Sequence, residues 1–192
     1  MGTPPQVYYT EDRWNNWLDR LREEEIDPEN EDSARLLLNL QDDAAIAAAK
    51  ILTDFEDGEL DQETALDELI QVRDIVLSDV EFDEEEKLLL LDGVQTSLVC
   101  VFYTAEEYIV SGPADDDSIE EYIAAAADAE AAEDFDAAIE NCARAGTRII
   151  AGDNFDIQIA EDLEYGLVAE WVNGLDSLHT ALADPEVVEE DE

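Results

Sequence analysis

The chain has 192 residues, of which 46% are hydrophobic, enough to form the core of one compact domain. Acidic residues outnumber basic ones 54 to 9, and the formal charge at pH 7 is −45. This balance excludes a basic surface for nucleic acid. The apolar content also excludes an entirely disordered acidic chain.

The charge is explained by the solvent rather than by a ligand. At ordinary ionic strength, so much like charge would push a compact state apart. Near 1 M salt the Debye length falls to about 3 Å, which screens most of that repulsion. Only Lys50 and Lys87 are lysines. We therefore interpret the composition as adaptation to a halophilic cytoplasm, with nucleic-acid mimicry as the alternative.

No secretory signal or membrane span is expected. The N-terminal MGTPPQVYYTEDR has no apolar run after a basic start. The longest charge-free stretch in the apolar centre, GVQTSLVCVFYTA (93–105), has 13 residues and is shorter than the ~18 that a span needs. Cys100 and Cys142 are too few and too far apart for a disulfide framework or a zinc site. We expect reduced, buried thiols in a soluble cytoplasmic protein.

Almost the whole chain has helical periodicity, and no strand pattern competes with it. Helices are predicted at 10–25, 33–55, 62–78, 84–110, 119–132, 136–149 and 157–182. The expected fold is all-α, a single-domain bundle of six to eight helices over residues 10–182. An extended lead at 1–9 precedes it, and a disordered acidic tail at 183–192 follows it.

Capping residues support several of these helix starts. Thr10, Asp61 and Asp83 are expected N-caps, and Ser33 is expected to open the second helix. DDDSIEE (115–121) contains a capping box.

Two helices have unusual apolar patterns. The helix at 33–55 has an alternative start at Gln41-Asp42-Asp43, where an aspartate would cap a new helix. The helix at 84–110 is apolar on two faces, one through Leu91 and Leu98 and the other through Val94 and Val101. A helix with two apolar faces needs neighbours on both, so we place this one at the centre of the bundle.

The segment 119–145 resembles one tetratricopeptide unit, in which small residues let two antiparallel helices approach closely. Tyr122 stands at the large aromatic position and Phe135 in the turn, and both are expected to lock the hairpin. Ala129 departs from the motif, which has an aromatic residue there. Repeat arrays need about three units, and 46–69 is a poor second one. An ordinary alanine-rich hairpin in a helical bundle is therefore the favoured interpretation, and peptide binding in a concave groove is the alternative.

Four stretches also carry a family resemblance over nearly the full length. They are YYTEDRWNNWLDRL (8–21), DPENEDSARLLLNLQDDAAIAAAKI (27–51), LDGVQTSLVCVFYTAEEY (91–108) and EDLEYGLVAEWVNGLDSL (161–178). The chain resembles an uncharacterised family of acidic euryarchaeal proteins, best represented in haloarchaea and known as a domain of unknown function. The resemblance implies a haloarchaeal origin and supplies no catalytic residues.

No catalytic, cofactor-binding or metal-ligating pattern is found. Gly146 and Gly152 lack the lysine of a phosphate loop. His179 is the only histidine, which excludes a zinc site with two histidines and a ferritin-like di-iron centre. Glu161 and Glu164 are spaced to share a helix face and could do acid–base work, although 54 acidic residues produce such pairs by chance. We expect a protein that is not an enzyme.

One segment combines the residue types that are enriched at interface hot spots. The predicted interaction surface consists of Tyr8, Tyr9, Arg13, Trp14, Trp17, Arg20 and Arg22. The alternative is that the tryptophans, which have core spacing, are buried, and that the arginines pair with the acidic body of the same protein.

These observations lead us to expect a non-enzymatic protein-interaction module or adaptor in a high-salt cytoplasm. Its partner would be another protein, without direct contact to nucleic acid or membrane, and self-association into a homo-oligomer stays open. Two other functions are also considered. One is an acidic nucleic-acid mimic or binder of basic proteins, and the other is an enzyme with a carboxylate-only, divalent-cation-dependent site at Glu161 and Glu164.

Overall fold

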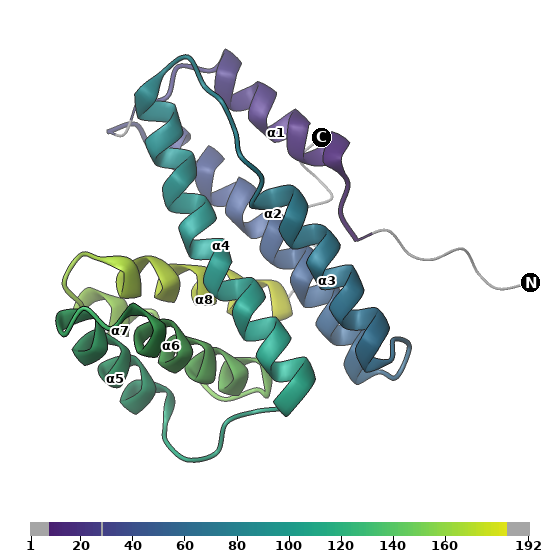
Figure 1. Ribbon diagram of the computed structural model, residues 1–192. Coiled ribbons are helices and arrows are strands. Elements are labelled where there is room, and N and C mark those ends of the chain that lie inside the picture. The colour runs from purple at the N-terminus through teal and green to yellow at the C-terminus, as the bar shows by residue number, and fades with distance from the viewer. Residues whose placement is uncertain (1–7, 28, 184–192) are drawn as a thin grey trace, which may run out of the picture.

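The computed structural model describes residues 8–27 and 29–183, and in this part of the chain it contains helices and no strand (Figure 1). The helices are α1 (Glu11–Glu23), α2 (Glu31–Glu56), α3 (Gln62–Val76), α4 (Glu85–Ser111), α5 (Ile119–Ala131), α6 (Phe135–Ile150), α7 (Gln158–Glu161) and α8 (Leu167–Ala183). The predicted all-α bundle is confirmed. Residues 1–7 of the predicted lead and 184–192 of the predicted tail lie outside the described residues.

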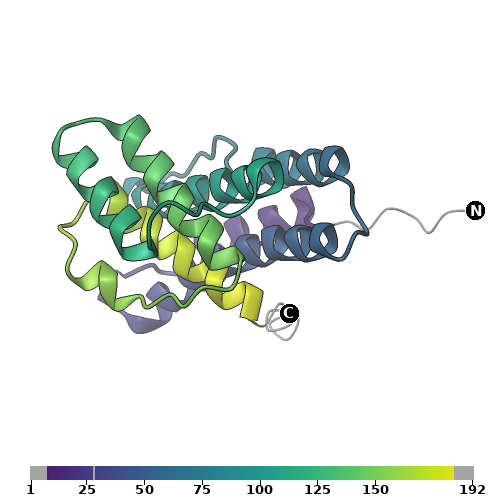
Figure 2. The same ribbon diagram turned by 90° about the horizontal axis from the view of Figure 1, so that it is seen from below.

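Helix α4 is the central helix, as its two apolar faces predict. It packs against α2, α3, α6 and α8. In Figures 1 and 2, α1 to α3 gather on one side of the molecule and α5 to α7 on the other. Two clusters of buried side chains match this division, and both α4 and α8 contribute to each of them. These two helices therefore join the halves of the bundle.

Among the described residues, α4 is also the one helix that is long and apolar enough to cross a membrane. Half of its apolar window is buried inside the bundle. Burial of this kind is expected of the core helix of a soluble protein.

Several predicted caps are present. Thr10 Oγ1 accepts a hydrogen bond from the Arg13 amide at 3.1 Å, and Asp61 accepts one from Thr64 at 2.8 Å. Ser118 and Glu121 form the expected reciprocal capping box at the start of α5. Each satisfies amides that a helix N-terminus leaves unpaired.

Two predicted helix starts are wrong. Residue Glu84, not Asp83, precedes α4, and it makes no side-chain capping bond. Helix α2 begins at Glu31 after the cap Asn30, two residues before Ser33. The hydroxyl of Ser33 instead accepts the Asp27 amide at 3.0 Å, so it fixes the loop before the helix.

Helix α2 runs through 41–43 without a break. The polar side chains that suggested a new start make contacts with other helices instead. Gln41 donates to Ser177 Oγ of α8 at 2.9 Å, and Asp43 accepts from α1. Contacts with other helices thus explain why polar residues occur at 41–43, and they need no role as a helix cap.

The single helix predicted at 157–182 is wrong, because the chain divides it into α7 and α8. The carboxylate of Glu130 in α5 accepts the Val168 amide at 3.0 Å and so caps α8. A Cβ atom at Gly166 would lie 2.6 Å from Glu130 Oε1. The glycine therefore makes room for a cap that comes from another helix.

The helical hairpin expected at 119–145 is formed by α5 and α6, with Tyr122 and Ala138 buried between them. The turn includes Glu133, which has a positive φ of 61°. Phe135 is 46% exposed, so its predicted locking role is wrong. It is the first residue of α6 and follows the cap Asp134, at the edge of the contact between the two helices.

Candidate interaction surface

The aromatic residues of the predicted surface at 8–22 point inward. Tyr9, Trp14 and Trp17 are only 7%, 3% and 7% exposed and belong to the core built by α1 to α4. The spacing of the two tryptophans is that of the buried stripe of an amphipathic helix. Burial, the alternative considered from the sequence, is what the structure shows for these three side chains.

Asp43 of α2 fixes this helix to the bundle. Its carboxylate is 2% exposed and accepts hydrogen bonds from Arg13 Nε at 2.7 Å and Trp17 Nε1 at 2.8 Å. The second guanidinium nitrogen of Arg13 also donates to it. A buried carboxylate is tolerated only with such donors. Burial, followed by the charge of Asp43, raises the pKa of the neighbouring Tyr9.

The other members of the predicted surface also have partners within the chain. The Arg20 guanidinium lies 4.9 Å from the centre of the Trp17 ring, and that of Arg22 lies 5.2 Å from the Phe82 ring. Tyr8 donates to Asp54 at 2.5 Å. The structure thus uses these residues to attach the N-terminal segment.

A different set of apolar side chains faces the solvent along the central helix. Leu89, Val99, Tyr103 and Val110 are 66%, 38%, 38% and 56% exposed. Together with the polar residues Asp92, Thr96 and Glu106 they follow steps of three and four, as in the seam of a coiled coil. We call the outward-facing set the α4 strip, which consists of Leu89, Asp92, Thr96, Val99, Tyr103, Glu106 and Val110.

Neighbouring helices border the α4 strip on both sides. On the α3 side, Arg73 lies 3.5 Å from Glu106. On the α6 side, burial and then the nearby Glu140 carboxylate raise the pKa of Tyr103. The strip is therefore an apolar surface whose own charges, at Asp92 and Glu106, are both negative.

A sequence signal for this surface exists but was missed. The helical periodicity of α4 was assigned to two faces, both inside the bundle. Leu89, Val99, Tyr103 and Val110 form a third apolar face at the same spacing. A helix that is apolar on three sides has more apolar surface than its neighbours in a small bundle can cover.

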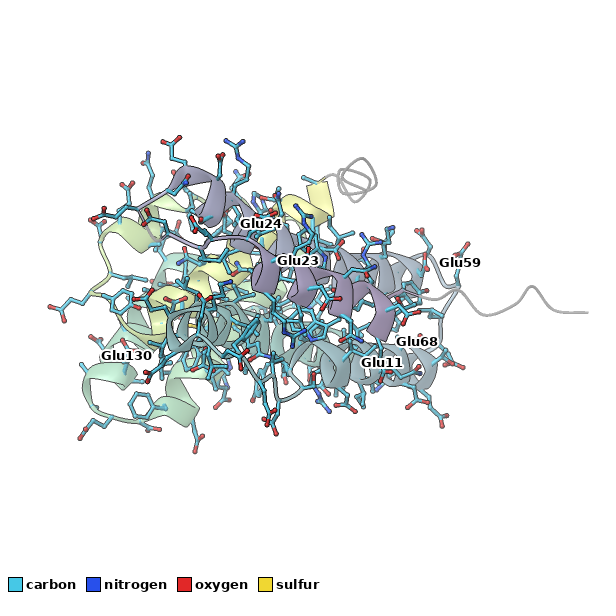
Figure 3. The ribbon with its side chains drawn as sticks, turned by 90° about the horizontal axis from the view of Figure 1, so that it is seen from above. Glu11, Glu23, Glu24, Glu59, Glu68 and Glu130 are labelled. Atoms are coloured by element: carbon cyan, nitrogen blue, oxygen red, sulfur yellow. The ribbon has the colours of Figure 1, made fainter. Side chains whose placement is uncertain are left out.

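The predicted carboxylate pair is not formed. Glu161 is the last residue of α7, and Glu164 lies in the irregular segment before α8, so the two do not share a helix face. Within residues 8–27 and 29–183, no group of three or more potential ligand side chains is placed to hold a metal ion. Carboxylates such as Glu11, Glu23 and Glu59 point outward instead (Figure 3).

Comparison with protein families agrees with the resemblance seen in the sequence. Residues 7–191 match the family described as uncharacterized protein conserved in archaea, DUF2150. The chain belongs to this archaeal family. No curated protein and no solved structure matches it.

Proposed function

We propose that this protein is a non-enzymatic interaction module, or adaptor, that binds an amphipathic helix of a partner protein along the α4 strip. The observation that carries this proposal is the exposure of Leu89, Val99, Tyr103 and Val110 on the central helix. A partner helix that covers them removes apolar surface from water, which is worth about 25 cal/mol per Å².

The charges of the strip favour a cationic partner. Asp92 and Glu106 are two heptads apart, roughly 21 Å along the axis at 1.5 Å per residue. Lysine or arginine at matching positions of a partner helix would meet the exposed Asp92 and would share Glu106 with Arg73. The partner is therefore expected to be an amphipathic helix with two basic residues about two heptads apart.

A second copy of the chain fits less well. Antiparallel pairing of two strips that sets Leu89 opposite Val110 also brings Asp92 close to Glu106 of the second copy. Parallel pairing in register sets each carboxylate opposite itself. Like charges directly across a helical seam are destabilising. This contrast favours the basic partner over a homo-oligomer.

The proposed setting is a high-salt cytoplasm. The charge of −45 supports it, because a Debye length of about 3 Å at 1 M salt screens the self-repulsion. In such a solvent, recognition depends on apolar contact and on ion pairs in direct contact, since long-range attraction is screened.

Affinity capture with cross-linking from a native high-salt lysate tests the surface. The strip variant carries Val99→Gln and Tyr103→Gln, and the matched control carries Leu38→Gln, which changes an exposed apolar residue of α2. We expect the partner to be lost with the strip variant and kept with the control, with cross-links on α4. A partner that binds wild type and strip variant equally would overturn the proposal.

A variant without the two carboxylates tests whether a basic partner helix or a second copy of the chain occupies the α4 strip. Asp92→Asn with Glu106→Gln removes the attraction to a basic helix and also the repulsion between two copies. We expect weaker partner binding and a protein that stays monomeric in sedimentation at 3 M KCl. Stronger self-association of this variant would favour the homo-oligomer instead.

A further inference from the structure

The two cysteines lie on different helices and meet inside the molecule. Cys100 belongs to α4 and Cys142 to α6, and both are fully buried in the cluster that joins α4, α5, α6 and α8. Both side chains belong to the same buried cluster, and the Cys100 thiol, ahead of burial, raises the pKa of Cys142, so the two thiols are neighbours. Their separation of 42 positions in the sequence gave no hint of this contact.

The helices cross closely beside this pair. Gly146 lies one turn after Cys142, and Thr104 lies one turn after Cys100. A Cβ atom at Gly146 would be only 2.4 Å from Thr104 Cγ2, and Cys100 Sγ is 3.8 Å from Thr104 Oγ1. The row formed by Cys100 and Thr104 thus faces the row formed by Cys142 and Gly146. A disulfide needs Cα atoms about 4.4–6.8 Å apart, and a glycine at the crossing lets two helices come that close.

We propose that Cys100 and Cys142 form a reversible disulfide that fastens α6 to α4. This inference is independent of the α4 strip. It assigns a covalent modification to two residues that would otherwise be ordinary core side chains. The bond would join α4, which contributes to both clusters of buried side chains, to the α5–α6 hairpin. It would close a loop of the chain that contains all of α5.

The reaction is a thiol–disulfide exchange with a low-molecular-weight disulfide. The thiolate of one cysteine attacks the reagent and releases one small thiol. The thiolate of the other cysteine then attacks the mixed disulfide and releases the second. The protein loses two protons and two electrons, and the reagent is reduced to two thiols.

The closed bundle slows this reaction. The Cys100 thiol and burial both raise the pKa of Cys142, so the pair stays protonated and out of reach of a reagent. Oxidation therefore needs a brief opening of the α5–α6 hairpin, and the bond forms when the hairpin closes again. We expect slow oxidation whose rate rises when KCl is lowered, because self-repulsion favours opening.

The test is incubation of the full chain with oxidised glutathione in 3 M KCl, followed by non-reducing peptide mapping and circular dichroism. We expect a Cys100–Cys142 cross-linked peptide, an intact mass lower by two hydrogen atoms, and unchanged helicity. The oxidised protein should keep its helices to lower KCl than the reduced protein, and a reductant should restore the original midpoint.

Cys142→Ala is the matched control, because it removes one sulfur atom and keeps the small side chain that this crossing needs. It should show no shift of the KCl midpoint after the same treatment. Three results would overturn the proposal. The first is that both cysteines stay reduced in the folded protein at 3 M KCl, although the chain unfolded by low salt is oxidised. The second is a product that carries only glutathione adducts, and the third is a Cys100–Cys142 cross-link that lowers the helicity.

Discussion

Helices α1 and α4 both carry apolar residues that could form a docking surface, and the fold uses them in opposite ways. The tryptophans of α1 look like a docking surface in the sequence but are buried against α2 to α4. The apolar residues at the outer side of α4 belong to a core helix, yet they face the solvent. Both helices carry large apolar side chains, so the residue type alone does not decide whether such a side chain is buried or exposed.

The difference is the number of neighbours that each helix has. Helix α1 has one apolar face and one large surface to cover it, and Asp43 holds it there through Arg13 and Trp17. Helix α4 has apolar residues all round, but α2, α3, α6 and α8 leave one side open. An apolar pattern therefore predicts a buried face only where enough neighbours exist.

Removing salt should have the largest effect, because it acts on both regions at once. With 54 acidic residues and 9 basic ones, screening is needed to keep the bundle compact. We expect most of the helicity to be lost when KCl is lowered from 3 M to 0.1 M, as followed by circular dichroism. Full helicity at 0.1 M would contradict the assignment to a high-salt cytoplasm.

A pair of leucines two residues apart on α4 tests the contrast between inner and outer faces. Leu91 is fully buried, whereas Leu89 is mostly exposed. We expect Leu91→Ala to lower the free energy of unfolding by about 2–5 kcal/mol. Leu89→Ala should change it by less than about 1 kcal/mol. Urea unfolding at fixed KCl measures both, and equal losses would mean that the strip is covered.

Asp43→Ala tests how α1 is held. The change removes the carboxylate that accepts from Arg13 and from the Trp17 indole, and breaking a buried charged pair costs about 3 kcal/mol. We expect that loss in urea unfolding at 3 M KCl, with a change in tryptophan fluorescence. Asp67→Ala removes an exposed carboxylate from α3 and serves as the control. A similar small effect for both variants would show that Asp43 does not hold the helix.

The crossing of α4 and α8 can be tested with two glycines. A Cβ atom at Gly174 would lie 2.2 Å from the Ser97 carbonyl oxygen, whereas at Gly93 the nearest atom is 4.0 Å away. Gly174→Ala should therefore destabilise by about 1–3 kcal/mol. Gly93→Ala should stabilise by about 0.5–1 kcal/mol, because alanine is the better helix former. Melting curves at constant KCl compare them, and losses of the same size would rule out a close approach.

The smallest expected effect is a pH dependence between α2 and α8. Burial raises the pKa of Asp42 and of Asp176 above the ordinary 3.8. Folded protein then holds protons that the unfolded chain releases. This contribution to stability is fully present below pH 3.8 and is lost as pH rises through the raised values. Asp42→Asn should make the free energy of unfolding, measured with urea, depend less on pH. The same pH dependence in wild type and variant would contradict this prediction.

Sequence periodicity was sufficient for most of the fold, because nearly every helix has a buried stripe of its own. It failed where the decisive partner is distant. The start of α8 depends on Gly166 and Glu130, which are far apart in the sequence. Asp43 looked like a helix start because its partner, Arg13, lies in another helix.

The candidate site was less predictable for the same reason. Whether an apolar residue of α4 is inside or outside depends on how many helices surround it, and periodicity within one helix cannot give that number. The contact of Cys100 with Cys142 likewise depends on how α6 crosses α4. Such features become visible only when the helices are placed.

The cap of α8 has a consequence for the order of folding. Because Glu130 belongs to α5, the first turn of α8 has this amide partner only after the hairpin has formed. Helix α8 also contributes to both clusters of buried side chains. Helix α8, the last helix of the described residues, is therefore expected to be completed late, and its completion couples the two halves into one cooperative unit that unfolds in a single transition.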